Sequence, residues 1–129
     1  MIKILILDDE KGLCDQLKKY FGYRGYTVFA VTSGKEALSV IKKESPQILV
    51  LDIRMDGVTG LDVLKKAKED NPNVKAVMIT ALSDDATKEQ AKELGADEYI
   101  TKPFSYDVLE KLIIHMVNKV IKLEEAGGK

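Results

Sequence analysis

Short apolar runs alternate with stretches of helical periodicity along almost the whole chain. Most of the runs would be apolar on both faces of a strand, as expected where both sides of a sheet are covered. The runs are Ile4–Leu7, Val28–Val31, Ile48–Leu51, Ala76–Ile79 and Glu98–Ile100. Between and after them, apolar residues recur every three or four positions, which is the spacing of an amphipathic helix. The pattern therefore predicts five strand–helix units.

Residues that start and end helices agree with this division. Gly25 follows the first helical stretch and Gly95 the fourth, at positions where a left-handed residue often ends a helix. Ser33–Glu36 and Ser83–Asp85 have the composition of helix starts. The apolar residues that mark the five helical stretches are Leu13, Leu17 and Phe21; Ala37, Leu38 and Ile41; Leu61, Val63, Leu64 and Ala67; Ala86, Ala91 and Leu94; and Leu109, Leu112, Ile113, Met116 and Val120.

Strands that alternate with helices indicate an α/β domain. Consecutive strands joined by helices pair in parallel through right-handed crossovers, so helices cover both faces of the sheet. Five strands are too few for the closed barrel of eight units, and we expect an open sheet. The 129 residues suffice for one such domain and not for two. Because open parallel sheets bind ligands beyond the carboxyl ends of their strands, chemistry is expected at that edge.

Composition narrows the picture by exclusion. The formal net charge of −1 does not resemble the basic surface of a nucleic-acid binder. Cys14 is the only cysteine, so neither an internal disulfide nor a cysteine zinc cage can form. The first residues show no signal-peptide layout, and no apolar run approaches the ~20 residues of a membrane helix. We expect a cytoplasmic chain that contacts neither nucleic acid nor membrane.

Polar residues follow four of the five predicted strands. Asp8–Glu10 follow the first strand, Asp52 the third, Thr80–Ala81 the fourth and Thr101–Lys102 the fifth. Since parallel strands end at one edge, the three carboxylates of Asp8, Asp9 and Asp52, the Thr80 hydroxyl and the Lys102 ammonium are expected to meet there. Clustered carboxylates repel one another unless a cation intervenes, and one lysine cannot neutralise three of them. An all-oxygen site of this kind suits Mg²⁺.

Such a site can also carry out chemistry. A carboxylate can attack a phosphoryl donor and become an aspartyl phosphate. The transferred group then needs its oxygens neutralised and held, and Lys102 and Thr80 offer a positive charge and a hydroxyl for that purpose. Asp8 and Asp9 could instead cap the first helix, a common use of aspartate. The presence of Asp52 favours the metal interpretation.

The set Asp8-Asp9, Asp52, Thr80-Ala81 and Lys102-Pro103 resembles the motif of the receiver domains of two-component response regulators. The resemblance covers residues 3–119 at matching separations, and residues 120–129 would extend the last helix and end in a flexible tail. It implies a flavodoxin-like (βα)5 three-layer sandwich with parallel strands in the order 2-1-3-4-5. It also implies a phosphorylation switch that catalyses only its own phosphorylation and dephosphorylation, and not an enzyme.

The resemblance further implies a role for each site residue. Asp52 would be the phosphoacceptor. Lys102 would pair first with Asp52 and then with a phosphoryl oxygen, aimed by a cis peptide bond before Pro103. Ala81 would leave room for the phosphoryl group. The implied Mg²⁺ ligands are Asp8, Asp9, Asp52 and the backbone carbonyl of Arg54.

Signal output would depend on a second pair of residues. By the same resemblance, the Thr80 hydroxyl would move toward the phosphoryl group while the Tyr99 ring turns inward. The readout surface would be formed by the fourth helix, the fifth strand and the fifth helix, which could also form a homodimer. The implied partners are a sensor histidine kinase or phosphotransfer protein as donor, and a downstream output domain or protein.

Three further features of this sequence bear on the loop after Asp52, on dephosphorylation and on the last helix. Asp56 stands where such domains often have proline, which loosens the loop without removing a ligand. Arg54 and Leu82 would flank the hydrolytic water, and neither can accept a hydrogen bond from it, so we expect slow to moderate self-dephosphorylation. The last helix, from Ser105 to about Glu125, would be ~30 Å long and outrun a strand of ~17 Å. It would therefore pair with another helix or continue into a longer protein.

Three other functions compete with this interpretation. A flavodoxin-type electron carrier would need a phosphate-binding loop where Asp8–Glu10 stand, and these would repel the flavin phosphate. A haloacid-dehalogenase-type phosphatase would need a second aspartate where Arg54 stands. An interaction module that is never phosphorylated is the third alternative, which only a phosphorylation assay can separate.

Overall fold

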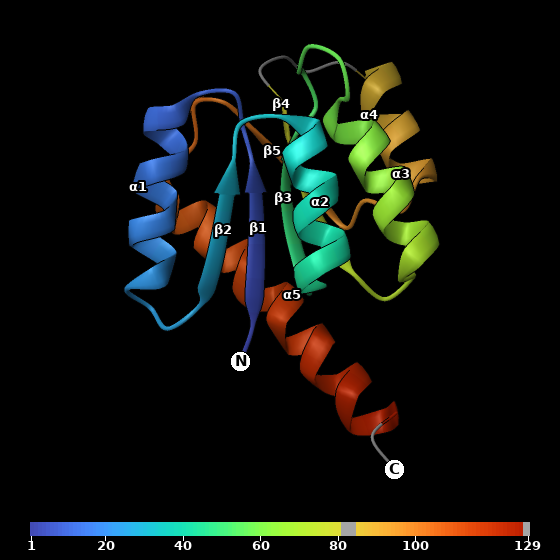
Figure 1. Cartoon of the computed structure of the whole chain (residues 1–129). Coiled ribbons are helices and arrows are strands. Elements are labelled where there is room, and N and C mark those ends of the chain that lie inside the picture. Colours follow the sequence, from blue (N-terminus) through green and yellow to red (C-terminus); the bar gives the residue numbers. More distant parts are fainter. Residues whose placement is uncertain (81–84, 128–129) are drawn as a thin grey trace.

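The computed structural model describes residues 1–80 and 85–127, in which five strands and five helices alternate (Figure 1). All neighbouring strands pair in parallel, and their order is β2-β1-β3-β4-β5, as the resemblance implied. The elements are β1 (Lys3–Leu7), α1 (Lys11–Gly22), β2 (Thr27–Val31), α2 (Gly34–Glu44), β3 (Ile48–Asp52), α3 (Gly60–Asp70), β4 (Lys75–Thr80), α4 (Asp85–Glu93), β5 (Glu98–Thr101) and α5 (Tyr106–Gly127).

The sheet lies between two layers of helices (Figure 1). Along β1, Ile4 and Ile6 pack in a cluster with residues of α1 and α5, whereas Leu5 and Leu7 pack with residues of α2, α3 and α4. All four side chains are fully buried. Successive side chains of a strand point to opposite faces, so a strand between two helical layers is apolar throughout. The three-layer flavodoxin-like sandwich is confirmed.

The start of α3 is held directly against the end of β3. A Cβ atom added to Gly60, the first residue of α3, would collide with the backbone carbonyl of Asp52. The preceding Thr59 caps the helix, because its hydroxyl accepts a hydrogen bond from the backbone N–H of Asp62. In return, the Asp62 carboxylate accepts one from the backbone N–H of Thr59 at 3.0 Å. The loop that leaves Asp52 is therefore fixed at its far end.

The predicted helix ends are largely confirmed. Gly25 and Gly95 adopt φ angles of +96° and +99°, the left-handed region that favours glycine. The Ser33 hydroxyl accepts a hydrogen bond from the backbone N–H of Glu36 at the start of α2. Most of the start predicted at Ser83–Asp85 lies outside the described residues.

A few predicted boundaries are wrong by one or two residues. Asp52 and Thr80 do not follow their strands but end them, because their backbones still pair with Ile79 and Thr101 on the neighbouring strands. The helix α5 reaches Gly127 and so includes two residues of the predicted loose tail. The preceding Glu124–Ala126 are good helix formers, which explains the longer helix.

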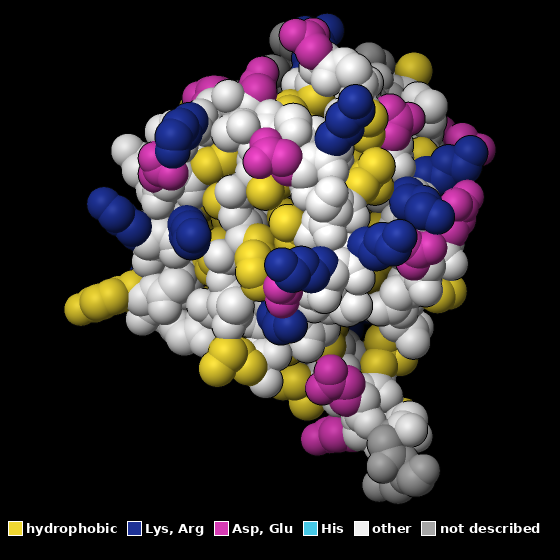
Figure 2. All heavy atoms as spheres, in the orientation of Figure 1, with side chains coloured by type: hydrophobic (Ala, Val, Ile, Leu, Met, Phe, Trp, Pro, Cys, Tyr) yellow, Lys and Arg dark blue, Asp and Glu magenta, His cyan; other side chains and the backbone are white. Residues whose placement is uncertain are grey.

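The surface mixes charges of both signs. On the face shown in Figure 2, Lys and Arg side chains are interspersed with Asp and Glu side chains, and the end of α5 projects from the body. Four apolar side chains of α5 are 40% to 48% exposed, namely Val108, Ile114, Ile121 and Leu123. Within the described ranges, no helix combines the length and the apolar character that a membrane crossing requires.

Candidate functional site

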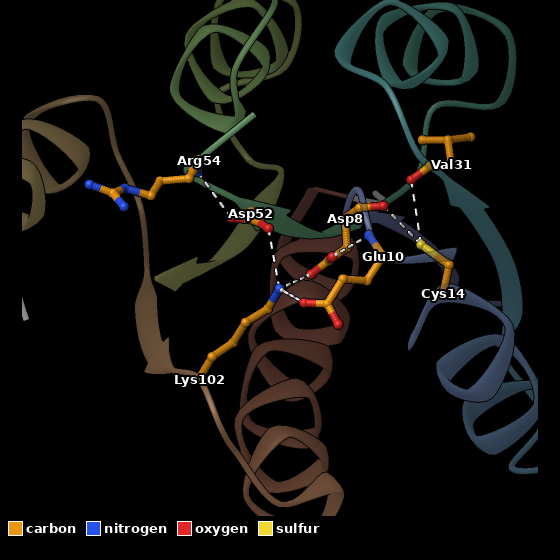
Figure 3. A network of polar contacts seen from close by, with 7 residues as sticks. All are labelled: Asp8, Glu10, Cys14, Val31, Asp52, Arg54 and Lys102. Carbon is orange, nitrogen blue, oxygen red and sulfur yellow. Dashed lines mark hydrogen bonds and ion pairs between the residues drawn. The ribbon is translucent and has the colours of Figure 1, made fainter. Parts of the chain in front are cut away.

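The carboxyl ends of the strands bring the predicted site residues together at one edge of the sheet. Asp8 directly follows β1, Asp52 ends β3, and Lys102 directly follows β5. In Figure 3 the Lys102 side chain reaches toward both aspartates. Asp8 is 0% exposed and Asp52 is 5% exposed, although carboxylates are rarely buried without a partner. Lys102 is that partner.

The Lys102 ammonium is shared among three carboxylates. Its Nζ lies 2.9 Å from Asp8 Oδ2, 2.9 Å from Glu10 Oε1 and 3.4 Å from Asp52 Oδ2. Burial of the ammonium lowers its pKa, but the hydrogen bond to Glu10, the close contact with Asp8 and the charges of Asp8 and Asp52 outweigh burial. The net effect raises the pKa of Lys102. Lys102 is therefore a permanent positive charge at this edge.

The Asp52 carboxylate is held from two sides. Its Oδ1 accepts a hydrogen bond from the backbone N–H of Arg54 at 3.0 Å, and its Oδ2 faces Lys102. Burial raises the pKa of Asp52, and the neighbouring Asp8 charge raises it further, against the opposing effects of Arg54 N–H and Lys102. The Arg54 side chain is exposed and points away from Lys102 (Figure 3). One face of the Asp52 carboxylate is thus fixed by the loop that follows β3.

The carboxylates form a set of ligands that fits a divalent cation. Asp8, Asp9 and Asp52 each offer one oxygen, and these oxygens lie within 4.8 Å of one another. Asp8 Oδ2 is buried and, although it forms an ion pair with Lys102, it accepts no hydrogen bond of acceptable geometry. Three carboxylates against one ammonium leave a negative excess. An all-oxygen donor set with an unsatisfied buried oxygen fits Mg²⁺ and not a soft metal.

The two predicted switch residues lie on adjacent strands. Thr80 is buried at the end of β4, and its carbonyl accepts a hydrogen bond from the backbone N–H of Lys102 at 2.8 Å. Tyr99 on β5 is half-buried, and its hydroxyl donates to the Lys88 carbonyl of α4 at 3.1 Å. The peptide bond between Lys102 and Pro103 is cis, as the resemblance implied. Of the remaining predictions, those on Ala81 and Leu82 lie outside the described residues.

Sequence reasoning assigns no role to Glu10, yet its carboxylate is as close to the Lys102 ammonium as that of Asp8. The contact joins residues that are 92 positions apart. The only signal in the sequence is that Glu10 follows Asp8 and Asp9 after the first strand. Nothing in that triplet shows which carboxylate turns toward the lysine.

The family of response regulator receiver domains matches residues 4–114 of this sequence. The chain belongs to this family. The receiver domain is 39% identical over 120 residues to the probable transcriptional regulator ycf27 of Porphyridium aerugineum, covering 93% of this chain and 50% of that protein. It is 36% identical over 125 residues to the response regulator SaeR of Staphylococcus aureus (strain USA300), covering 97% and 53% respectively. The chain spans about half the length of these curated relatives.

Solved structures share the fold of this receiver domain. A response regulator receiver domain protein from Clostridium thermocellum superposes with a TM-score of 0.88 at 26% identity, over 95% of this chain and 99% of that chain. The CheY-like receiver domain protein from Methanospirillum hungatei JF-1 gives a TM-score of 0.86 at 28% identity, over 95% and 98%. The likeness confirms family and fold, and the roles of single residues stay predictions.

Proposed function

We propose that this receiver domain accepts a phosphoryl group on Asp52 in a Mg²⁺-dependent reaction and thereby changes conformation to control an output domain or a partner protein. One observation carries the proposal: the buried Asp52 carboxylate lies next to both the Lys102 ammonium and the carboxylates of Asp8 and Asp9. A nucleophile, a cation that stays charged and a set of metal ligands are thus combined at one edge of the sheet.

The chain's own residues suit each part of the transfer. A carboxylate oxygen of Asp52 would bond to phosphorus as the bond between phosphorus and the donor's histidine nitrogen breaks. Lys102, 3.4 Å from Asp52 Oδ2, would neutralise one phosphoryl oxygen, and the Thr80 hydroxyl would donate to another. Bound Mg²⁺ would neutralise further phosphoryl oxygens. Its ligands would be Asp8, Asp9, Asp52 and the backbone carbonyl of Arg54.

Phosphorylation adds nearly two negative charges and strong hydrogen-bond acceptors next to Thr80 and Lys102. These two residues would then have better hydrogen-bond partners in the active conformation than in the inactive one. This difference would shift the equilibrium toward the active conformation. An inward turn of the Tyr99 ring would break its hydrogen bond to the Lys88 carbonyl of α4. The face formed by α4, β5 and α5 would therefore carry the signal.

The proposed partners follow from the family. A sensor histidine kinase or a phosphotransfer protein would supply the phosphoryl group, and the domain would act in the cytoplasm. An output domain or protein, or a second copy of the chain, would bind the face formed by α4, β5 and α5. The domain would act as a switch and not as an enzyme, since it would turn over only its own phosphoryl group.

Treatment with acetyl phosphate and Mg²⁺ followed by intact-mass measurement tests the proposal. The expected result is a mass increase of one phosphoryl group that is abolished in Asp52→Ala and strongly reduced in Asp9→Asn. The control Asp56→Asn, which changes an exposed carboxylate in the loop between β3 and α3, should keep the mass increase. An unmodified wild-type protein would favour an interaction module that is never phosphorylated.

A further inference from the structure

The side chain of Glu10 is committed to Lys102 and not to the helix that it precedes. Glu10 is the N-cap residue of α1, but its side chain makes no capping hydrogen bond. Its carboxylate instead accepts a hydrogen bond from Lys102 Nζ at 2.9 Å. The backbone N–H of Glu10 donates to Asp8 Oδ1 at 2.9 Å, which holds the start of this side chain beside the site. Glu10 therefore lies at the rim of the acidic cluster, and its carboxylate contacts Lys102.

The three carboxylates around Lys102 differ in burial. Asp8 and Asp52 are buried, whereas the Glu10 side chain is 63% exposed. An exposed ion pair is weak and readily exchanged, because water can replace either partner. Of the three ion pairs of the ammonium, the one with Glu10 is therefore the least costly to break.

A phosphoryl group on Asp52 would compete with Glu10 for the same ammonium. Lys102 Nζ lies 2.9 Å from Glu10 Oε1 and 3.4 Å from Asp52 Oδ2, so it is closer to Glu10. A phosphoryl oxygen would offer the ammonium a stronger acceptor on the Asp52 side. The negative charge of Glu10 would at the same time repel the incoming phosphoryl oxygens. Both effects favour the unphosphorylated arrangement.

We infer that Glu10 is a positioning residue that holds Lys102 partly away from Asp52 in the resting site and so opposes phosphorylation. The inference rests on the proposed phosphorylation of Asp52 and deepens it. It assigns Glu10 a function opposite to that of Asp9, although the two residues are adjacent and carry the same charge. Asp9 would promote phosphoryl transfer through the metal, and Glu10 would restrain it through the lysine.

Two variants test the inference in the full chain with saturating Mg²⁺. Glu10→Gln keeps the size of the side chain and an acceptor oxygen, and Glu10→Ala removes the acceptor at this position. Both are expected to be phosphorylated by acetyl phosphate about twofold to fivefold faster than the wild type, the range that corresponds to one exposed ion pair. Both should also bind beryllium trifluoride, a mimic of the phosphoryl group, more tightly by a similar factor in a titration followed by amide NMR.

A matched control separates loss of the contact from loss of charge. Asp56→Asn also removes one exposed carboxylate near the site, and among the described residues Asp56 forms no ion pair with Lys102. It should show less than half of the change seen for Glu10→Gln. Equal effects of the two variants would reduce Glu10 to a general charge and overturn the inference.

The two proposals fail in different ways. Wild-type protein that is not phosphorylated on Asp52 would contradict the proposed function. If the wild-type protein is phosphorylated and both Glu10→Gln and Glu10→Ala react at the wild-type rate, only the role of Glu10 would be contradicted. Slower variants would also overturn it, because they would mean that Glu10 orients Lys102 for the reaction.

Discussion

Asp52 is a carboxylate that is 5% exposed next to a second buried carboxylate, and its raised pKa means that its ionised form is less favourable in the folded chain than in the unfolded chain. Replacement by the isosteric asparagine removes the charge and keeps the shape. Without Mg²⁺ at neutral pH, Asp52→Asn should raise the free energy of unfolding by about 1 kcal/mol, or Tm by roughly 4 °C. Thermal unfolding followed by circular dichroism measures this, with Asp56→Asn as the control that should change little.

The raised pKa of Asp52 also fixes the sign of a pH dependence. Burial raises the pKa of Asp52 in the folded state above its value in the unfolded chain, so the folded chain holds this proton more tightly. The stability of the metal-free wild type should therefore fall, relative to Asp52→Asn, as pH rises from the unfolded pKa to the folded pKa of Asp52. The gap between the two proteins should close at pH values below the unfolded pKa. A gap that widens on acidification would contradict the assignment.

Cys14 is expected to be chemically inert in the folded protein. It is 3% exposed, and its Sγ donates to the backbone carbonyl of Asp8 at 3.2 Å. Burial raises the pKa of the Cys14 thiol to about 11, so little thiolate is present at pH 8. Alkylation by iodoacetamide at pH 8 should be at least ~100-fold slower in native protein than in urea. Fast native labelling would mean that this part of α1 opens readily.

At the scale of elements, the first residue of α3 packs directly against the last residue of β3, next to the site. Gly60→Ala would drive a methyl group into the carbonyl of Asp52, which is backbone and cannot yield. We expect a loss of about 2 kcal/mol or more in unfolding free energy, together with slower phosphorylation. Urea denaturation and the acetyl phosphate assay measure the two effects. Gly12→Ala, near the start of α1 with open space around it, is the control and should not destabilise the chain.

Much of the element pattern could be predicted because each strand carries its own signal. A strand covered on both faces must be apolar at every position, and Ile4–Leu7 and Ile48–Leu51 are. The strand order could not be read from periodicity, since nothing in a single strand specifies its neighbours; it came from the resemblance. The edge that gathers Asp8, Asp52 and Lys102 follows from parallel pairing alone.

Two long-range side-chain contacts could not be predicted from the sequence. The bond between Glu10 and Lys102 depends on how two loops approach each other, and the bond from Tyr99 to the Lys88 carbonyl depends on how α4 lies on β5. Neither spacing nor residue type reports such distances. The end of α5 was predicted near Glu125 and lies at Gly127, because the residues before that glycine favour helix.

At the scale of the whole molecule, Mg²⁺ should stabilise the fold. A ligand that binds only the folded chain adds about 1.4 kcal/mol for each tenfold excess over its dissociation constant. Tm should therefore rise with Mg²⁺ concentration in the wild type and stay nearly constant in Asp9→Asn, which lacks one of the clustered carboxylates. A Na⁺ salt at matched ionic strength serves as the control. An equal rise in both proteins would indicate general screening and not a site.

The end of α5 would enlarge movements of the part of the helix that is packed in the core. The helix is buried in the core from Leu109 to Val120, and the described helix continues to Gly127, about 10 Å past Val120 at 1.5 Å per residue. A tilt of about 10° around Leu109 would shift the helix axis by about 3 Å at Val120 and by roughly 5 Å at Gly127. The projecting end would therefore amplify any shift that the core allows.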